Sequence, residues 1–124
     1  MMTPETLLHQ LQTKPDSVEF DDVMTVIGEN FVYTPTHFTN GHGNDCVNNA
    51  AGENEGSCKI FALGQLLQLT EEQTLACFGK YYRQDVLQQP HGTSHANIRT
   101  FMRYGWPGIH FDKPALQPKP PCQH

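Results

Sequence analysis

The chain has 124 residues and a formal net charge of −5, which comes from 13 acidic and 8 basic side chains. A chain of this length forms one domain and can bury a hydrophobic core without a metal or disulfides. The acidic balance argues against nucleic acid or an anionic membrane as the main partner, because both select for clustered Lys and Arg.

The N-terminal segment and the cysteines indicate the cellular compartment. The first residues lack the basic and apolar regions of a secretory signal, and no apolar run approaches the roughly 20 residues of a membrane span. No two of the 4 cysteines share a C-x-x-C spacing, so thiols are expected rather than disulfides. These features favour a soluble, cytoplasmic protein, and no motif indicates a cofactor.

Hydrophobic periodicity and capping residues predict five helices along the chain. Thr3 and Ser17 are the expected N-caps of the first two helices, and Thr70 opens a capping box for the fourth. Thr93 or Ser94 is the expected cap of the fifth. The approximate ranges are 4–13, 18–27, 58–69, 71–89 and 95–104.

Two extended segments complete the expected fold. Residues 31–38 are rich in aromatic and β-branched side chains, and Pro35 makes them an edge strand or a broken one. They are expected to pair with residues 108–111. The prediction is one helix-rich α+β domain with a small antiparallel sheet and a central helix at 58–69. The expected core consists of Phe20, Val23, Ile27, Phe61, Leu66, Leu75, Phe78, Ile98 and Phe101.

Two further segments carry no periodic pattern. Residues 40–56 are rich in Asn and Gly, so we expect a long irregular loop, either functional or packed over the core. Residues 113–124 contain four prolines and are expected to form a disordered tail. The predicted domain therefore spans residues 1–112.

Three stretches form a combination that is specific in sequence. They are Phe38-Thr39-Asn40-Gly41, Asn54-Glu55-Gly56-Ser57-Cys58-Lys59-Ile60-Phe61, and a longer one from Thr74 to Ile109 that includes Cys77-Phe78-Gly79-Lys80-Tyr81-Tyr82-Arg83. Together they resemble the HopJ-type (HopPmaJ) protein family over most of residues 3–112. The family is named after a type III secreted effector of a plant pathogen. The resemblance implies an effector-like protein of unassigned activity, with the exposed side of residues 40–56 as an interaction surface and a protein target as one possible partner.

A thiol and an imidazole form a candidate catalytic pair. Cys58 lies at the expected start of a helix, where the helix dipole and the neighbouring Lys59 would lower the pKa of the thiol. His95 is the candidate base, and Asn97 or Asn40 would orient it. The alternative function is thus a small cysteine-dependent hydrolase or transferase. The competing interpretation makes Cys58 and His95 ordinary core side chains.

A further alternative is a module that binds a ligand or a metal without turnover. Arg suits the recognition of carboxylate or phosphate groups, although a solvated helix face explains the same residues. His91 and His95 are four residues apart, but no third ligand is specified by spacing, so no metal site is predicted. The candidate binding residues are Asn40, Asn54, Lys59, Tyr82, Arg83 and Arg99.

Overall fold

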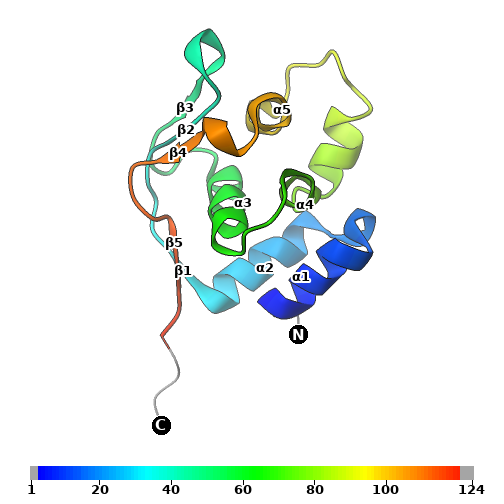
Figure 1. The fold of residues 1–124 in the computed structure, drawn as a ribbon, viewed down its shortest axis with the longest axis vertical. Coiled ribbons are helices and arrows are strands. Elements are labelled where there is room, and N and C mark those ends of the chain that lie inside the picture. Colours follow the sequence, from blue (N-terminus) through cyan, green and yellow to red (C-terminus); the bar gives the residue numbers. More distant parts are fainter. Residues whose placement is uncertain (1–2, 121–124) are drawn as a thin grey trace.

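Residues 3–120 are described by a computed structural model, in which groups of helices and groups of short strands follow one another along the chain (Figure 1). The helices are α1 (Pro4–Thr13), α2 (Phe20–Asn30), α3 (Glu55–Leu66), α4 (Glu71–Ala76) and α5 (Ala96–Tyr104), with a π-helical segment at Tyr81–Val86. The strands are β1 (Phe31–Tyr33), β2 (Phe38–Asn40), β3 (Val47–Asn49), β4 (Ile109–Phe111) and β5 (Leu116–Pro118). The fold is α+β, as predicted. Within residues 3–120, no helix is long and apolar enough to cross a membrane.

Helix α3 is central, as its nearly continuous apolar sequence predicted. Figure 1 shows it in the middle of the molecule, with the strands along one side and α1, α2 and α4 on the other. The ring of Phe61 on α3 lies 4.9 Å from that of Phe101, 5.6 Å from that of Phe78 and 6.1 Å from that of Phe38, measured between centroids. These aromatic contacts join α3 to α5, to β2 and to the segment that follows α4.

Most of the predicted core is confirmed. The buried members are Val23, Ile27, Phe61, Leu75, Phe78, Ile98 and Phe101. Leu66 was predicted wrongly, since 46% of it is exposed. Helix α3 ends at this residue, and the chain then turns at Gln68, whose φ is 55°. Because of this turn, Leu69 rather than Leu66 is the buried leucine. Phe20 is half-buried and packs at the edge of the core.

The helix boundaries follow local capping chemistry in part. The Thr3 hydroxyl accepts the N–H of Thr6 at 3.1 Å, and the predicted capping box of Thr70 is present at α4. Ser17, however, is not the cap of α2. It lies in a 3₁₀ turn and donates to the carbonyl of Lys14, and the extended residue Val18 is buried before α2 begins.

The predicted helix at 71–89 is divided. Helix α4 ends at Ala76, and Gly79 has a φ of +60°. A Cβ at position 79 would lie 2.8 Å from the backbone nitrogen of Phe20. Glycine is therefore required here both by conformation and by the close approach of the chain that leads into α2.

Two glycine substitutions should change stability in opposite directions. Gly79→Ala is expected to lower the free energy of unfolding by about 1–3 kcal/mol, because it combines a strained φ with a steric clash. Gly28→Ala is expected to raise it by about 0.5–1 kcal/mol, because position 28 lies within α2 and its Cβ would meet open space. Chemical denaturation measures both, and a change of the same sign in the two variants would contradict this explanation.

The strands form two small antiparallel sheets. In the first, β2 lies between β3 and β4 and pairs Phe38 with Phe111, which confirms part of the predicted pairing. In the second, β1 pairs with β5, so that Phe31 lies opposite Pro118. The partner predicted for residues 31–33 was therefore wrong, because Pro35 lies in an irregular segment between two strands that join different sheets.

Two expectations about irregular segments were also wrong. Residues 40–56 are not one long loop, since β2 and β3 form a hairpin and α3 begins at Glu55. Residues 113–120 are not a detached tail, because Ala115 and Leu116 are buried against the core and β5 pairs with β1. The remainder of the predicted tail, 121–124, lies outside the described residues.

Candidate functional site

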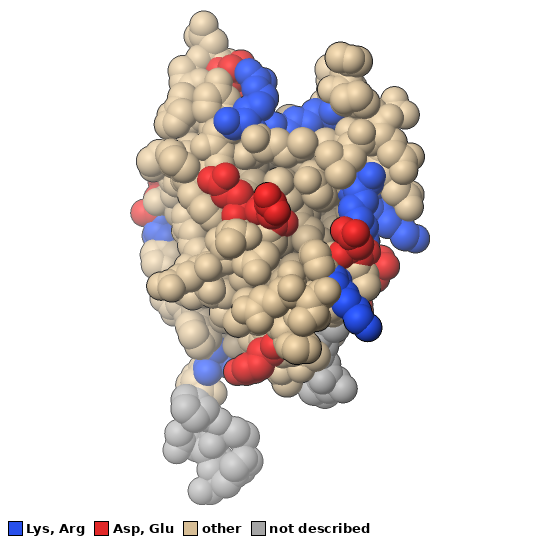
Figure 2. All heavy atoms as spheres, turned by 45° about the vertical axis from the view of Figure 1, so that its right-hand side comes forward, with Lys and Arg blue, Asp and Glu red and all other residues tan. Residues whose placement is uncertain are grey.

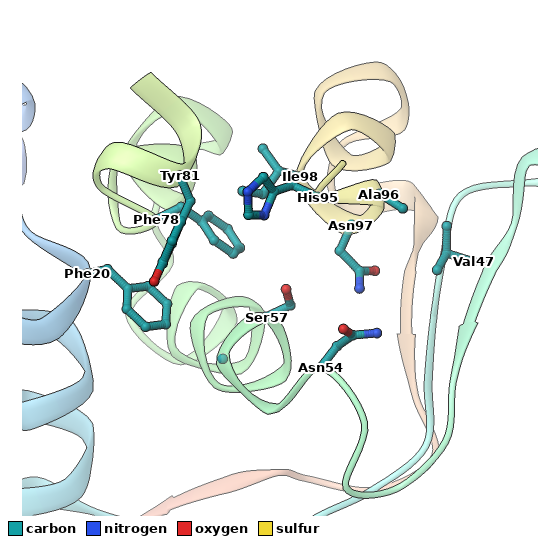
Figure 3. A pocket seen from close by; sticks show the side chains of 11 residues that line it. Phe20, Val47, Asn54, Ser57, Phe78, Tyr81, His95, Ala96, Asn97 and Ile98 are labelled. Carbon is teal, nitrogen blue, oxygen red and sulfur yellow. The ribbon is translucent and has the colours of Figure 1, made fainter. Parts of the chain in front are cut away.

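A cavity of about 350 Å³ lies where the N-terminal ends of α3 and α5 meet (Figure 3). We call it the α3–α5 cavity. Asn54 and Ser57 enter it from the start of α3, and His95 and Asn97 from the start of α5. Figure 3 shows the Ser57 hydroxyl pointing into this space, on the side of His95 and Asn97.

The opposite wall of the cavity is aromatic. It is formed by Phe20, Phe78 and Tyr81. The Phe20 and Tyr81 rings meet edge to face at 5.1 Å, and the imidazole of His95 lies 5.3 Å from the Tyr81 ring. The cavity is thus polar along the two helix ends and apolar across from them.

Both helices begin without a side-chain cap. Their N-cap residues, Asn54 and His95, have φ angles of 49° and 55°, in the left-handed region. The first backbone hydrogen bonds within these helices run from the N–H of Cys58 to the Asn54 carbonyl and from the N–H of Arg99 to the His95 carbonyl. The amides that precede them have no acceptor within the helix, and each helix end therefore offers N–H donors and a partial positive charge at the cavity.

An asparagine network fixes the polar wall. Asn49 Oδ1 accepts from Asn54 Nδ2 at 2.7 Å and from Asn97 Nδ2 at 2.9 Å. Asn40 Nδ2 donates to the Asn97 carbonyl at 2.8 Å and to its Oδ1 at 3.1 Å. The network joins β2, β3 and both helix ends, so it holds the cavity in one geometry.

His95 is oriented by a carboxylate. Its Nε2 lies 3.0 Å from Oδ2 of Asp85, which is in the π-helical segment. Asn97 and Asn40, which were expected to orient His95, form a hydrogen bond with each other instead. The imidazole is therefore positioned between Asp85 and the Tyr81 ring, at the rim of the cavity.

Cys58 lies away from this arrangement. It is 1% exposed and is absent from the lining of the α3–α5 cavity, and among residues 3–120 no hydrogen bond joins it to His95. Burial raises the pKa of the Cys58 thiol, although the Tyr33 hydroxyl and the Thr36 backbone act in the opposite direction. The low thiol pKa expected at this helix start is therefore wrong, because desolvation is the largest effect and exceeds the opposing one of Lys59.

The reactivity of the thiols should follow this burial. Cys58 is expected to resist iodoacetamide in the folded protein and to react only on unfolding, because its sulfur is shielded and its pKa is raised. Cys46, which is partly exposed, is the internal control and should react before Cys58. Peptide mass spectrometry after a timed reaction measures both, and alkylation of Cys58 as fast as that of Cys46 would contradict the prediction.

The other candidate binding residues are not collected at one site. Lys59 places its Nζ 4.7 Å from the centre of the Tyr33 ring, and Tyr82 packs against the core. Arg83 donates to the Val18 carbonyl at 2.9 Å. Arg99 donates to backbone carbonyls, as described below. In the part of the chain that the structure describes, no three His, Cys, Asp or Glu side chains are grouped so that they could hold a metal ion.

The structure places Asn54, Asn97 and His95 at one cavity and bonds Asn40 to Asn97 behind it. The sequence singled out all four, but in roles other than these. Asn49 and Ser57 were missed. The density of asparagine between residues 40 and 54 was a usable signal, since buried amides must satisfy one another. The aromatic wall had no signal of its own, because Phe20 and Phe78 follow the same spacing as core residues.

Comparison with known proteins gives the family of the chain. A family model described as HopJ type III effector protein matches residues 4–116, which extends past the expected boundary at 112. Among solved structures, the chain is similar to one described as "Crystal structure of unknown function protein VPA0580". The two are 49% identical with a TM-score of 0.88, and the match covers 93% of this chain and 92% of that chain. Curated proteins gave no match. By motif, by family model and by similarity over nearly its whole length, the chain belongs to the HopJ family.

Proposed function

We propose that this HopJ-family protein binds a small organic acid in the α3–α5 cavity. The observation that carries the proposal is the convergence of two uncapped helix N-termini on one cavity of about 350 Å³. Backbone N–H groups and the helix dipole both favour a negatively charged group at this position. The Ser57 hydroxyl supplies a further hydrogen-bond donor beside it.

The aromatic wall defines the rest of the ligand. Phe20, Phe78 and Tyr81 offer ring surfaces across the cavity from the helix ends. A ligand that spans the cavity therefore carries an aromatic or aliphatic body in addition to its acidic group. Sites with a mainly apolar lining and a few fixed polar groups are typical of small-molecule binding.

A thermal-shift titration tests the proposal. The probes are carboxylates from benzoate to 4-phenylbutyrate, each compared with its uncharged primary amide. A ligand that binds only the folded state raises the Tm as its concentration increases. We expect saturable increases with the acids and smaller ones with the amides, because only the acids carry the charge that the helix ends favour. Equal responses to acid and amide, or no response to any probe, would overturn the proposal.

A pair of variants tests the location. His95→Gly removes the imidazole from the cavity rim, while glycine tolerates the positive φ of position 95. It is expected to weaken acid binding by about fivefold or more, which corresponds to roughly 1 kcal/mol. His91→Gly is the matched control, since His91 is exposed and does not line the cavity. Unchanged affinity in His95→Gly would place the binding site elsewhere.

We also propose that the protein acts as an effector delivered through a type III secretion system. The family description supports this role. The test fuses the chain to an adenylate cyclase reporter and compares host cells exposed to bacteria with and without a working secretion apparatus. We expect cyclic AMP to rise in host cells only when the secretion apparatus is intact. Equal cyclic AMP signals from the two bacterial strains would contradict delivery.

A further inference from the structure

A second concave surface lies on the outer side of α5, away from the α3–α5 cavity. It is a groove of about 310 Å³ between α5 and the segment that follows the π-helical turn. Val86, Leu87 and Pro90 line one side, and Met102 lines the other together with two arginines of α5. We call it the α5 groove.

The α5 groove exposes apolar side chains. Leu87 is 47% exposed and Met102 is 43% exposed, and both are among the few large hydrophobic residues that the described chain leaves open to solvent. Both residues line the same groove, so their exposure is grouped rather than scattered over the surface. Methionine adapts its shape to different partners, which suits a surface that receives another chain.

The charges of the α5 groove are of one sign. Arg99 and Arg103 are the charged residues that line it, in a protein whose net charge is −5. Figure 2 shows Lys and Arg side chains around the hollow between the two projections at the top of the view, with acidic atoms beside them on the left projection. Arg103 is paired with a carboxylate, so Arg99 supplies the positive charge of the α5 groove that no carboxylate offsets, and this charge would attract a negatively charged group of a partner.

The Arg99 guanidinium is held in place without a carboxylate. It donates to the carbonyls of Ser94 at 2.6 Å and Gln89 at 2.7 Å, and it lies 3.3 Å from that of Asp85. Its charge is thus fixed at the groove and is not neutralised by these contacts. Arg103 is paired with Asp45 at 2.7 Å, at the side of the groove nearer the hairpin.

We propose that the α5 groove docks an acidic amphipathic helix of a partner protein. The apolar side chains of such a helix, spaced at i, i+3, i+4 and i+7, would cover Leu87 and Met102, and its carboxylates would lie against Arg99. An anionic membrane would face a wide area of a protein whose net charge is −5, and it is therefore disfavoured. A short acidic peptide contacts only the α5 groove, where the nearby charge is that of Arg99. The residues that line this groove lie outside 40–56, the segment for which the family resemblance implied an interaction surface, although Arg103 contacts Asp45 of that segment.

Selection from a displayed library of random peptides tests the proposal without assuming a partner. The full chain is immobilised, and the affinities of recovered peptides are measured by fluorescence anisotropy. We expect binders with net negative charge and helical apolar spacing, whose affinity falls as the salt concentration rises. Recovery of no binders, or of neutral and basic ones, would overturn the proposal.

Matched variants locate the binding. Met102→Glu places a carboxylate in the α5 groove and is expected to weaken binding by about tenfold or more. Leu66→Glu is the control, because Leu66 is exposed to a similar extent and lies outside the groove. Both positions are at the surface, so both variants should fold, which circular dichroism verifies. Binding that survives Met102→Glu, or that is lost equally in Leu66→Glu, would contradict docking in the α5 groove.

Discussion

Replacing Phe61 by alanine is expected to lower the free energy of unfolding by about 3–5 kcal/mol. The Phe61 side chain is fully buried on the central helix, and its ring contacts those of Phe38, Phe78 and Phe101. Truncation would remove the aromatic contact between α3 and β2 and leave a cavity in the core. Urea denaturation followed by circular dichroism measures the change.

The control for this variant lies on the same helix. Leu66→Ala changes a side chain that the hydrophobic pattern assigns to the core but that is 46% exposed. Its effect is expected to stay within about 0.5 kcal/mol, as for other surface substitutions. A loss at Leu66 comparable with that at Phe61 would show that α3 packs differently from the structure described above.

The second large effect is expected at Asn49. Its side chain is fully buried and accepts hydrogen bonds from Asn54 and Asn97. Asn49→Ala would leave the Asn97 amide buried without this acceptor, at a cost of about 2–3 kcal/mol. The loss is expected to appear as a lower urea midpoint with an unchanged slope.

Asn48 provides the matched control for Asn49. It is the adjacent residue of β3 and its side chain is exposed. Asn48→Ala is expected to change the free energy of unfolding by no more than about 0.5 kcal/mol. Equal effects at positions 48 and 49 would show that strand propensity, rather than the buried amide network, determines the cost.

The parts of the fold that sequence could predict depend on near neighbours in the chain. The capping box at Thr70 and the N-cap at Thr3 were both predicted, because each follows from residues within one helical turn. The apolar sequence of α3 likewise indicated a central helix. Such features carry their physical cause within a short segment.

The parts that were missed depend on distant contacts. The strand Val47–Asn49 consists mainly of a residue type that strands disfavour, and it forms because Asn49 bonds to residues far along the chain. The order of residues 115–118 likewise comes from pairing with β1, which no local pattern in a proline-rich segment reveals. The break at Gly79 requires knowledge that Phe20 lies against it.

The candidate site shows the same division. Single residues with distinctive chemistry, such as His95 and Asn97, were recognisable in the sequence, whereas their partners were not. Asp85 orients His95 across ten positions, and Asn49 bonds Asn97 across 48. For Cys58 the sequence left both an activated thiol and an ordinary core side chain open, and only the packing shows that it is buried and that burial raises its pKa.

The most direct measurement for the central claim is chemical-shift mapping of the isotope-labelled protein during titration with 4-phenylbutyrate. The claim is that the α3–α5 cavity holds a small organic acid between two helix ends and an aromatic wall. The predicted result is that the largest saturable shifts occur at the backbone amides of Ser57 and Asn97, together with ring signals of Tyr81. Saturable shifts confined to residues away from this cavity, or no shifts at concentrations where the Tm increases, would contradict it.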